Sequence, residues 1–202
     1  MNIWLHAASS WIFAKDVFKW LFKNDVPGRD RIDEKGRNIW LNAARGFGGE
    51  ELFKLLFRNR IPGVQQIDHE GKNIWHWVAS RGDLDILKLL ARHHVKGQDR
   101  MDKHGRNIWL HAVKGYPTTE IFQWLKDNDV LGEDAIDHQG RNIWFYVATD
   151  RDRASSGIID RLRWLKENDV PGKDALDNEG KSVTDMTKDN EVKKWLKENE
   201  VH

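Results

Sequence analysis

Two kinds of side chain in this sequence could carry chemistry: nine histidines, and a tryptophan that recurs five times in the triplet Asn-Ile-Trp. Histidine binds metals and acts as a general base, and a row of indole rings can stack on a flat ligand. Cysteine is absent, which excludes disulfides, thiolate nucleophiles and Cys-ligated zinc. The chain also lacks His-Glu-x-x-His, Gly-x-Ser-x-Gly, a phosphate loop and Gly-x-Gly-x-x-Gly. A reactive site would therefore need the histidines or the tryptophans to meet in space.

The tryptophans belong to an internal repeat. The triplet begins at Asn2, Asn38, Asn73, Asn107 and Asn142, and a degenerate sixth copy begins at Ser182, which gives spacings of 36, 35, 34, 35 and 40 residues. A second landmark, one polar residue followed by Trp-Leu or Leu-Leu, begins 19 residues before the next copy in all five cases, at Lys19, Lys54, Lys88, Gln123 and Arg163. The length variation is thus confined to one segment of the repeat, which indicates a surface loop. The largest insertion lies at residues 150–157, and whether that loop is functional or only tolerated stays open.

Each copy predicts two helices and two turns. In the third copy, Asn73 is placed as an N-cap and Gly82 as a left-handed helix end. Residues 83–93 then form a longer amphipathic run. A Val-Pro-Gly-like turn and an Asp-x-x-Gly-Arg/Lys turn follow, so about a dozen residues of each copy are extended or turning. That leaves no room for the two long helices of a tetratricopeptide-type repeat.

The unit instead resembles the ankyrin repeat, in which a β-turn finger is followed by two antiparallel helices. The resemblance rests on Asp-x-x-Gly-Arg/Lys before the first helix, an Ala-Ala or Val-Ala pair within it, and Leu-Leu or Trp-Leu in the second helix. Tryptophan stands where the family usually has leucine, and only His76 keeps the family histidine. The resemblance implies an all-α repeat solenoid, an ankyrin-like stack of about six helix-turn-helix units with β-turn fingers.

We expect one domain over residues 1–202, with units at approximately 1–35, 36–70, 71–104, 105–139, 140–179 and 180–202. The last unit is rich in charge, as expected for a terminal repeat that faces water. The first unit is as apolar as an internal one. Two explanations of that apolar edge stay open: a partner covers it, or the sequence is part of a longer protein.

A solenoid keeps like residues apart. Equivalent positions lie one repeat away from each other, about 8–10 Å, so His69 and His138 stand roughly 20 Å apart, whereas zinc ligands lie about 2.0–2.3 Å from one ion. The repeated tryptophans fall on the buried stripe of a short helix, and Trp20, Trp124, Trp164 and Trp195 of the second helix are interpreted as core in the same way. We therefore expect no catalytic residue, metal, cofactor or small-molecule substrate.

Net charge weakens the interpretation of the chain as a nucleic-acid-binding protein. The net charge is +1, and acidic neighbours dilute the basic row of the finger turns, so nucleic-acid binding is a minor alternative. The members of that row are Arg37, Lys72, Arg106, Arg141 and Lys181.

No stretch approaches 18 uninterrupted apolar residues, so we expect no membrane span. The expected location is the cytoplasm, or the host cytosol for a secreted pathogen effector.

The resemblance implies a concave groove formed by finger tips and first helices, and residues that vary there are the natural contact set. The second position after the repeated tryptophan varies as His6, Asn42, Trp77, His111 and Tyr146. The finger tips contribute Lys35, His69, Glu70, Lys103, His104, His138 and Gln139. Trp77 suits either an interface anchor or packing within the solenoid. These residues predict a non-catalytic protein–protein interaction module, the alternative being a scaffold or substrate-recruiting segment of a larger protein, such as a pathogen effector.

Overall fold

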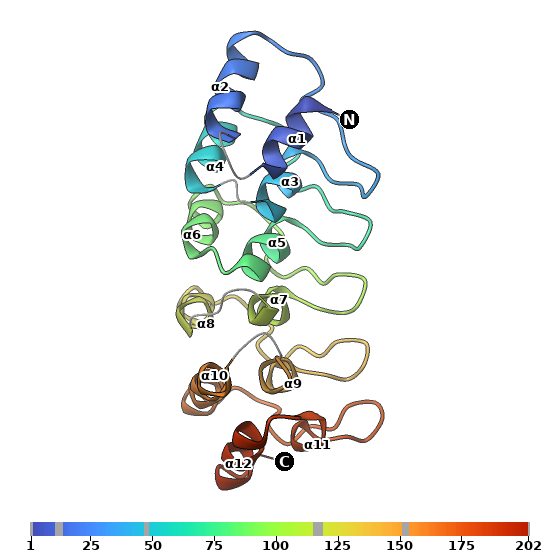
Figure 1. Ribbon diagram of the computed structural model, residues 1–202, viewed down its shortest axis with the longest axis vertical. Helices are drawn as coiled ribbons and strands as arrows, with labels where there is room; N and C mark the ends of the chain where they lie inside the picture. Colours follow the sequence, from blue (N-terminus) through green and yellow to red (C-terminus); the bar gives the residue numbers. More distant parts are fainter. Residues whose placement is uncertain (1, 11–13, 47–48, 115–118, 151–153, 202) are drawn as a thin grey trace.

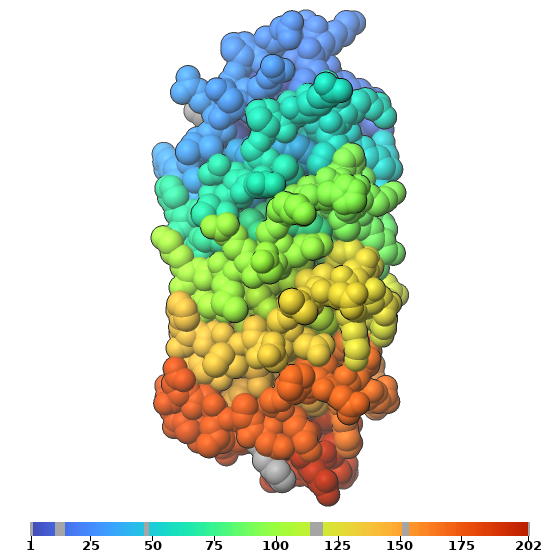
Figure 2. Space-filling model, turned by 180° about the vertical axis from the view of Figure 1, so that it is seen from behind, coloured from blue at the N-terminus to red at the C-terminus, as the bar shows by residue number. Residues whose placement is uncertain are grey.

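The computed structural model describes residues 2–10, 14–46, 49–114, 119–150 and 154–201. Over those ranges the chain forms twelve helices in six pairs, and its only β contact is an isolated bridge between Leu176 and Ser182. First helices stack in one column and second helices in another, and the fingers project beside the first column (Figure 1). From behind, the pairs form successive bands in chain order (Figure 2). We call each pair with its finger a unit and number the units 1 to 6; the all-α solenoid is confirmed.

The helix bounds show where the repeat is regular. The first helices are α1 (Ile3–Ser9), α3 (Ile39–Arg45), α5 (Ile74–Arg81), α7 (Ile108–Lys114), α9 (Ile143–Ala148) and α11 (Val183–Met186). The second helices are α2 (Ala14–Lys23), α4 (Gly49–Arg58), α6 (Leu84–Arg92), α8 (Thr119–Asp127), α10 (Ser155–Glu167) and α12 (Asn190–Glu198). Two of them depart from the others, because α11 has four residues and α10 has thirteen. No helix in the described ranges is long and apolar enough to cross a bilayer.

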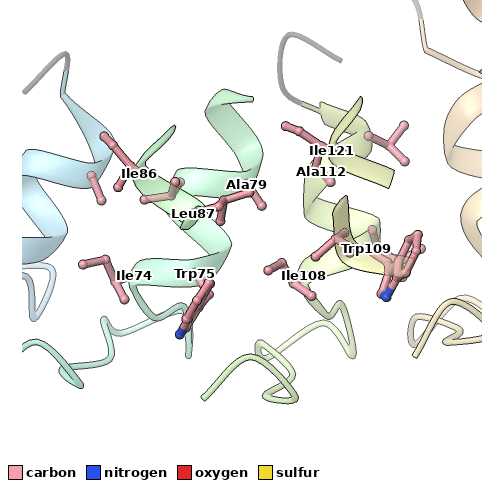
Figure 3. Close-up of a cluster of buried hydrophobic side chains, with 14 of the residues drawn as sticks. Ile74, Trp75, Ala79, Ile86, Leu87, Ile108, Trp109, Ala112 and Ile121 are labelled. Carbon is pink, nitrogen blue, oxygen red and sulfur yellow. The ribbon is translucent and has the colours of Figure 1, made fainter. Parts of the chain in front are cut away.

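The repeated tryptophans form the centre of the core, as predicted. All five are at most 1% exposed, and Trp75 and Trp109 lie at matching places in units 3 and 4 (Figure 3). Four of the indoles donate their Nε1–H to a carbonyl of the Val-Pro-Gly-like turn of their own unit; for Trp109 the acceptor is Val130, 2.8 Å away. The Nε1 of Trp75 has no such partner among the described residues. The tryptophan therefore joins the first helix to the turn beyond the second helix.

The asparagine before each of these helices makes a second link to the same turn. Its Oδ1 accepts from a backbone N–H of the first helical turn, which confirms the predicted cap. Its Nδ2 donates to the glycine carbonyl of the turn at 2.6–2.9 Å in all five units that carry it. In unit 4 that glycine, Gly132, has φ +100°, and a Cβ there would lie 2.3 Å from Asn107 Nδ2. The asparagine and the glycine are thus required together.

The tryptophans of the second helices are less buried than expected. Trp124, Trp164 and Trp195 are half-buried, and the expectation of a core position is wrong for Trp20, which is 57% exposed. The reason is visible at Trp164, whose ring lies 5.4 Å from Phe122 of the preceding unit. Such a tryptophan is covered by the unit before its own, and no described unit lies before unit 1.

Candidate functional site on the fingers and first helices

An aspartate organises every finger. One of its carboxylate oxygens accepts from the backbone N–H groups two and four residues later, at 2.8–3.0 Å, in all five fingers. These aspartates are Asp33, Asp68, Asp102, Asp137 and Asp177. Successive fingers are also joined tip to tip by backbone hydrogen bonds of 2.9 Å, as from His69 N–H to Lys35 C=O and from Lys103 N–H to Glu70 C=O. The tips therefore stand on a hydrogen-bonded frame.

The other carboxylate oxygen, Oδ2, explains which residue types occupy the variable position on the first helix. That position lies nine residues after the aspartate, and in four units its side chain donates a hydrogen bond to Oδ2. The donors are Asn42 Nδ2 at 3.3 Å, Trp77 Nε1 at 3.0 Å, His111 Nε2 at 2.9 Å and Tyr146 OH at 2.8 Å. Four different residue types thus meet one chemical requirement. In unit 6 the position holds Met186, and Asp177 instead lies 3.5 Å from Arg141 of unit 5.

Exposure divides the predicted contact residues into two groups. All seven finger-tip residues and His6 are exposed, and Trp77 and Tyr146 are half-buried. Asn42 and His111 are 4% and 2% exposed, so they support the fingers from within. We define the finger face as the exposed and half-buried set: Lys35, His69, Glu70, Lys103, His104, His138, Gln139, His6, Trp77 and Tyr146.

Asp33 and Asp102 each bind the guanidinium of their own finger, and the Asp102 side chain is the more buried of the two. The guanidinium of Arg106 reaches Asp102 Oδ2 through Nε at 2.9 Å and Nη2 at 2.8 Å, and His111 reaches the same oxygen. Burial alone would raise the pKa of Asp102, but the hydrogen bonds from His111 and Arg106 outweigh it and hold that pKa well below its usual range. The carboxylate is therefore charged and already matched by a guanidinium.

Two neutral histidines lie next to this pair. His111 donates through Nε2 to the carboxylate, so its Nδ1 accepts from Ser80 Oγ at 3.0 Å. His76, whose ring centre is 4.8 Å from that of His111, accepts at Nδ1 from Asn73 N–H and donates through Nε2 to the Arg100 carbonyl. Burial lowers the pKa of both rings, that of His111 to about 4. Both ring nitrogens of each histidine are thus engaged in hydrogen bonds within the chain.

We expect the free energy of unfolding to fall as the pH is lowered from 7 to 5, with about 1–2 kcal/mol of that loss due to His111. The unfolded chain protonates His111 near pH 6.5, whereas the folded chain does so only near pH 4. Its contribution is therefore intact above pH 6.5 and is lost as the pH falls toward 4. His111→Asn, which copies the residue of unit 2, should flatten the difference between denaturant titrations at pH 7 and pH 5. His6→Asn is the control, and an unchanged pH dependence in His111→Asn would remove His111 as the cause.

A metal centre finds no support in the described ranges. No group of three or more His, Asp or Glu side chains there has an arrangement that could hold a metal ion. The nearest approach of two such groups on the finger tips is His104 Nε2 to Glu70 Oε2, at 3.2 Å on the surface. The geometry offers hydrogen-bonding and charged side chains on fingers that are themselves held by hydrogen bonds.

Comparisons with known proteins agree with this geometry. Residues 39–135 match a family model described as ankyrin repeats in three copies. The chain is similar to a crystal structure titled EF0377, an ankyrin repeat protein, with a TM-score of 0.73, 18% identity and 96% of each chain covered. It is also similar to a chain in a structure titled as the Bd0816 predatory endopeptidase from Bdellovibrio bacteriovorus in complex with immunity protein Bd3460, with a TM-score of 0.70, 19% identity and 98% of each chain covered. No curated protein matches.

Proposed function

We propose that this chain, whose residues 39–135 match the ankyrin repeat family model and whose fold is similar to that of a solved ankyrin repeat protein, is a non-catalytic module that binds another protein through the finger face. Ankyrin repeats are generally protein-interaction modules. The observation that carries the proposal is a contrast within the fingers between the hydrogen-bonded backbone, which we call the frame, and the exposed side chains at the tips. The frame repeats the same hydrogen bonds from unit to unit, while the exposed tips change from Lys35 to His69 and Glu70, and then to Lys103 and His104. A fixed frame lowers the entropy cost of holding many side chains in place for a partner.

The basic row of the fingers supports a protein partner more than a nucleic acid. Arg37 and Arg106 lie 2.8 Å from Asp33 and Asp102 of their own fingers, and Lys181 lies 2.6 Å from Glu179. Lys72 sits over the ring of Trp77, 4.8 Å from its centre. Because these cations are already engaged within the chain, few phosphate contacts are left to them. A scaffold role in a larger protein and a cytoplasmic location stay predictions.

Reversing the charge of one finger tip should weaken partner binding. For a protein captured by wild-type chain, we expect the double variant Lys103→Glu/His104→Glu to bind at least tenfold more weakly, about 1.4 kcal/mol or more, with an unchanged thermal melt. Trp77→Ala and Tyr146→Ala should weaken the same complex, although each also removes a hydrogen bond to its finger aspartate. Calorimetric titration gives the affinities.

The matched control is Lys23→Glu/Lys88→Glu, which reverses two exposed charges on α2 and α6. It should bind the partner like wild type. If the control loses the partner and the finger variants keep it, the binding surface lies on the second helices and the finger face is wrongly assigned.

A further inference from the structure

Three departures from the repeat meet between units 5 and 6. The first helix of unit 6, α11, has four residues where the other first helices have six to eight. The connection between α9 and α10 carries the largest insertion, of which residues 151–153 lie outside the described ranges. Arg161 is 2% exposed at a position on the second helix where units 2, 3, 4 and 6 have Leu52, Ile86, Ile121 and Val192. Because all three departures lie at the junction of units 5 and 6, we attribute them to a requirement of that junction and not to the repeat in general.

The buried arginine fixes both sides of the insertion. Its Nη2 lies 3.0 Å from Asp150 Oδ2, its Nε 3.1 Å from the Gly157 carbonyl, and its Nη1 3.4 Å from the Val113 carbonyl of α7. A buried cation of this kind is costly unless its partners are well placed. Arg161 therefore forms hydrogen bonds with residues on both sides of the insertion and with α7 of unit 4.

The short α11 leaves a cavity beside these residues. Its volume is about 930 Å³, and its walls include Ala148, Ile158 and Met186 as well as the basic side chains of Lys188 and Lys193. In other units the end of the first helix carries a small apolar pair such as Ala43-Ala44, fully buried against its neighbours. In unit 6 the corresponding residues, Thr187 and Lys188, follow the end of α11 and line the cavity. A smaller cavity of about 200 Å³ shares Thr149 and Met186 with it and reaches Tyr146 of the finger face.

The charges around this cavity are unequally engaged. Each carboxylate on its wall already accepts hydrogen bonds: Asp150 from Arg161, Asp185 from Ser182, and Asp189 from Ser155 and the first amides of α12. Two of the cations are also paired, Arg141 with Asp177 and Lys181 with Glu179. Lys188 and Lys193 make no ion pair with any residue in the described ranges. The cavity wall therefore carries a few apolar side chains and two ammonium groups with no ion pair among the described residues. Hydrogen bonds from Ser182, and to a smaller extent the charge of Lys193, lower the pKa of Asp185.

We propose that this cavity is a second binding site and that it takes an acidic peptide segment of a partner protein. A small apolar side chain of the segment packs against Ala148, Ile158 and Met186, and its carboxylates pair with Lys188 and Lys193. The site continues through the smaller cavity to Tyr146, so one partner can occupy it together with the finger face. This inference rests on the proposed protein-binding function.

The test is an array of octapeptides in which a Gly-Ala-Val core is followed by acidic, neutral or basic residues, probed with the full chain at two salt concentrations. We expect the acidic set to be retained in preference to the other two, and more weakly at the higher salt. Lys188→Glu/Lys193→Glu should lower retention at least tenfold. Thr149→Phe, which fills the cavity without changing charge, should do the same, while Lys23→Glu/Lys88→Glu should match wild type. Circular dichroism melts check that each variant is folded.

Several results would overturn the site. Acidic peptides retained no better than basic ones, or equally well by the cavity variants, would remove it. So would displacement of the acidic peptides from wild type by a 20-nucleotide DNA that binds through the same two lysines. If Lys103→Glu/His104→Glu loses the captured partner while the cavity variants keep both partner and peptides, the finger face stands and this site falls. If instead the cavity variants lose the partner and the peptides while Lys103→Glu/His104→Glu keeps the partner, this site is supported and the finger face is wrongly assigned.

Discussion

Replacing Trp109 with alanine is expected to lower the free energy of unfolding by about 3–5 kcal/mol. The side chain is 1% exposed, and its Nε1 donates to the Val130 carbonyl at 2.8 Å. The substitution would leave a large cavity between units and an unpartnered carbonyl in the turn. Urea denaturation followed by circular dichroism measures the loss.

Trp20→Ala is the matched control, because it removes the same side chain from a position that is 57% exposed. It should cost less than about 1 kcal/mol. Equal losses for the two variants, or a loss below about 1 kcal/mol for Trp109→Ala, would contradict the assignment of the repeated tryptophans to the core.

Asp102→Ala is expected to cost about 3–5 kcal/mol, because it breaks a buried ion pair and leaves several donors without an acceptor. The Asp102 side chain is fully buried, and those of Arg106 and His111 are 14% and 2% exposed. The backbone N–H groups of His104 and Arg106 lose their acceptor as well. Denaturant titration again gives the free energy.

Two further variants separate the causes. Asp102→Asn keeps a carbonyl oxygen for part of these donors and should cost less than Asp102→Ala. Asp134→Ala removes an exposed aspartate just before the next finger aspartate, Asp137, and should change the free energy of unfolding by about 0.5 kcal/mol or less. A cost for Asp102→Ala no larger than that of Asp134→Ala would show that the carboxylate does not organise the finger.

The regular part of the fold could be predicted because it repeats. Five copies of Asn-Ile-Trp at nearly constant spacing predict the helix starts, the buried stripe and the stack itself, and Gly82 ends α5 with φ +76° as expected. The second bond of the asparagine could not be predicted in this way. It joins Asn107 to Gly132, 25 residues away, and only the packed unit brings those two residues together.

The variable position of the first helix was harder to interpret from sequence. His111 and Tyr146 share no size or charge, so variation alone indicated a contact surface. What they share is a hydrogen-bond donor placed nine residues after an aspartate, a signal present in the sequence at a spacing that helix periodicity does not single out. The short α11 and the buried Arg161 break the repeat, and their combined effect depends on packing between units 5 and 6.

The most direct test of the account is hydrogen–deuterium exchange of the chain with and without its captured partner. We predict added protection of the backbone amides at the finger tips, over residues 69–70, 103–104 and 138–139, and of first-helix amides near Trp77 and Tyr146. The amides of α4, α6 and α8 should exchange as in the free chain. Protection confined to those second helices, with the finger tips unchanged, would contradict binding through the finger face.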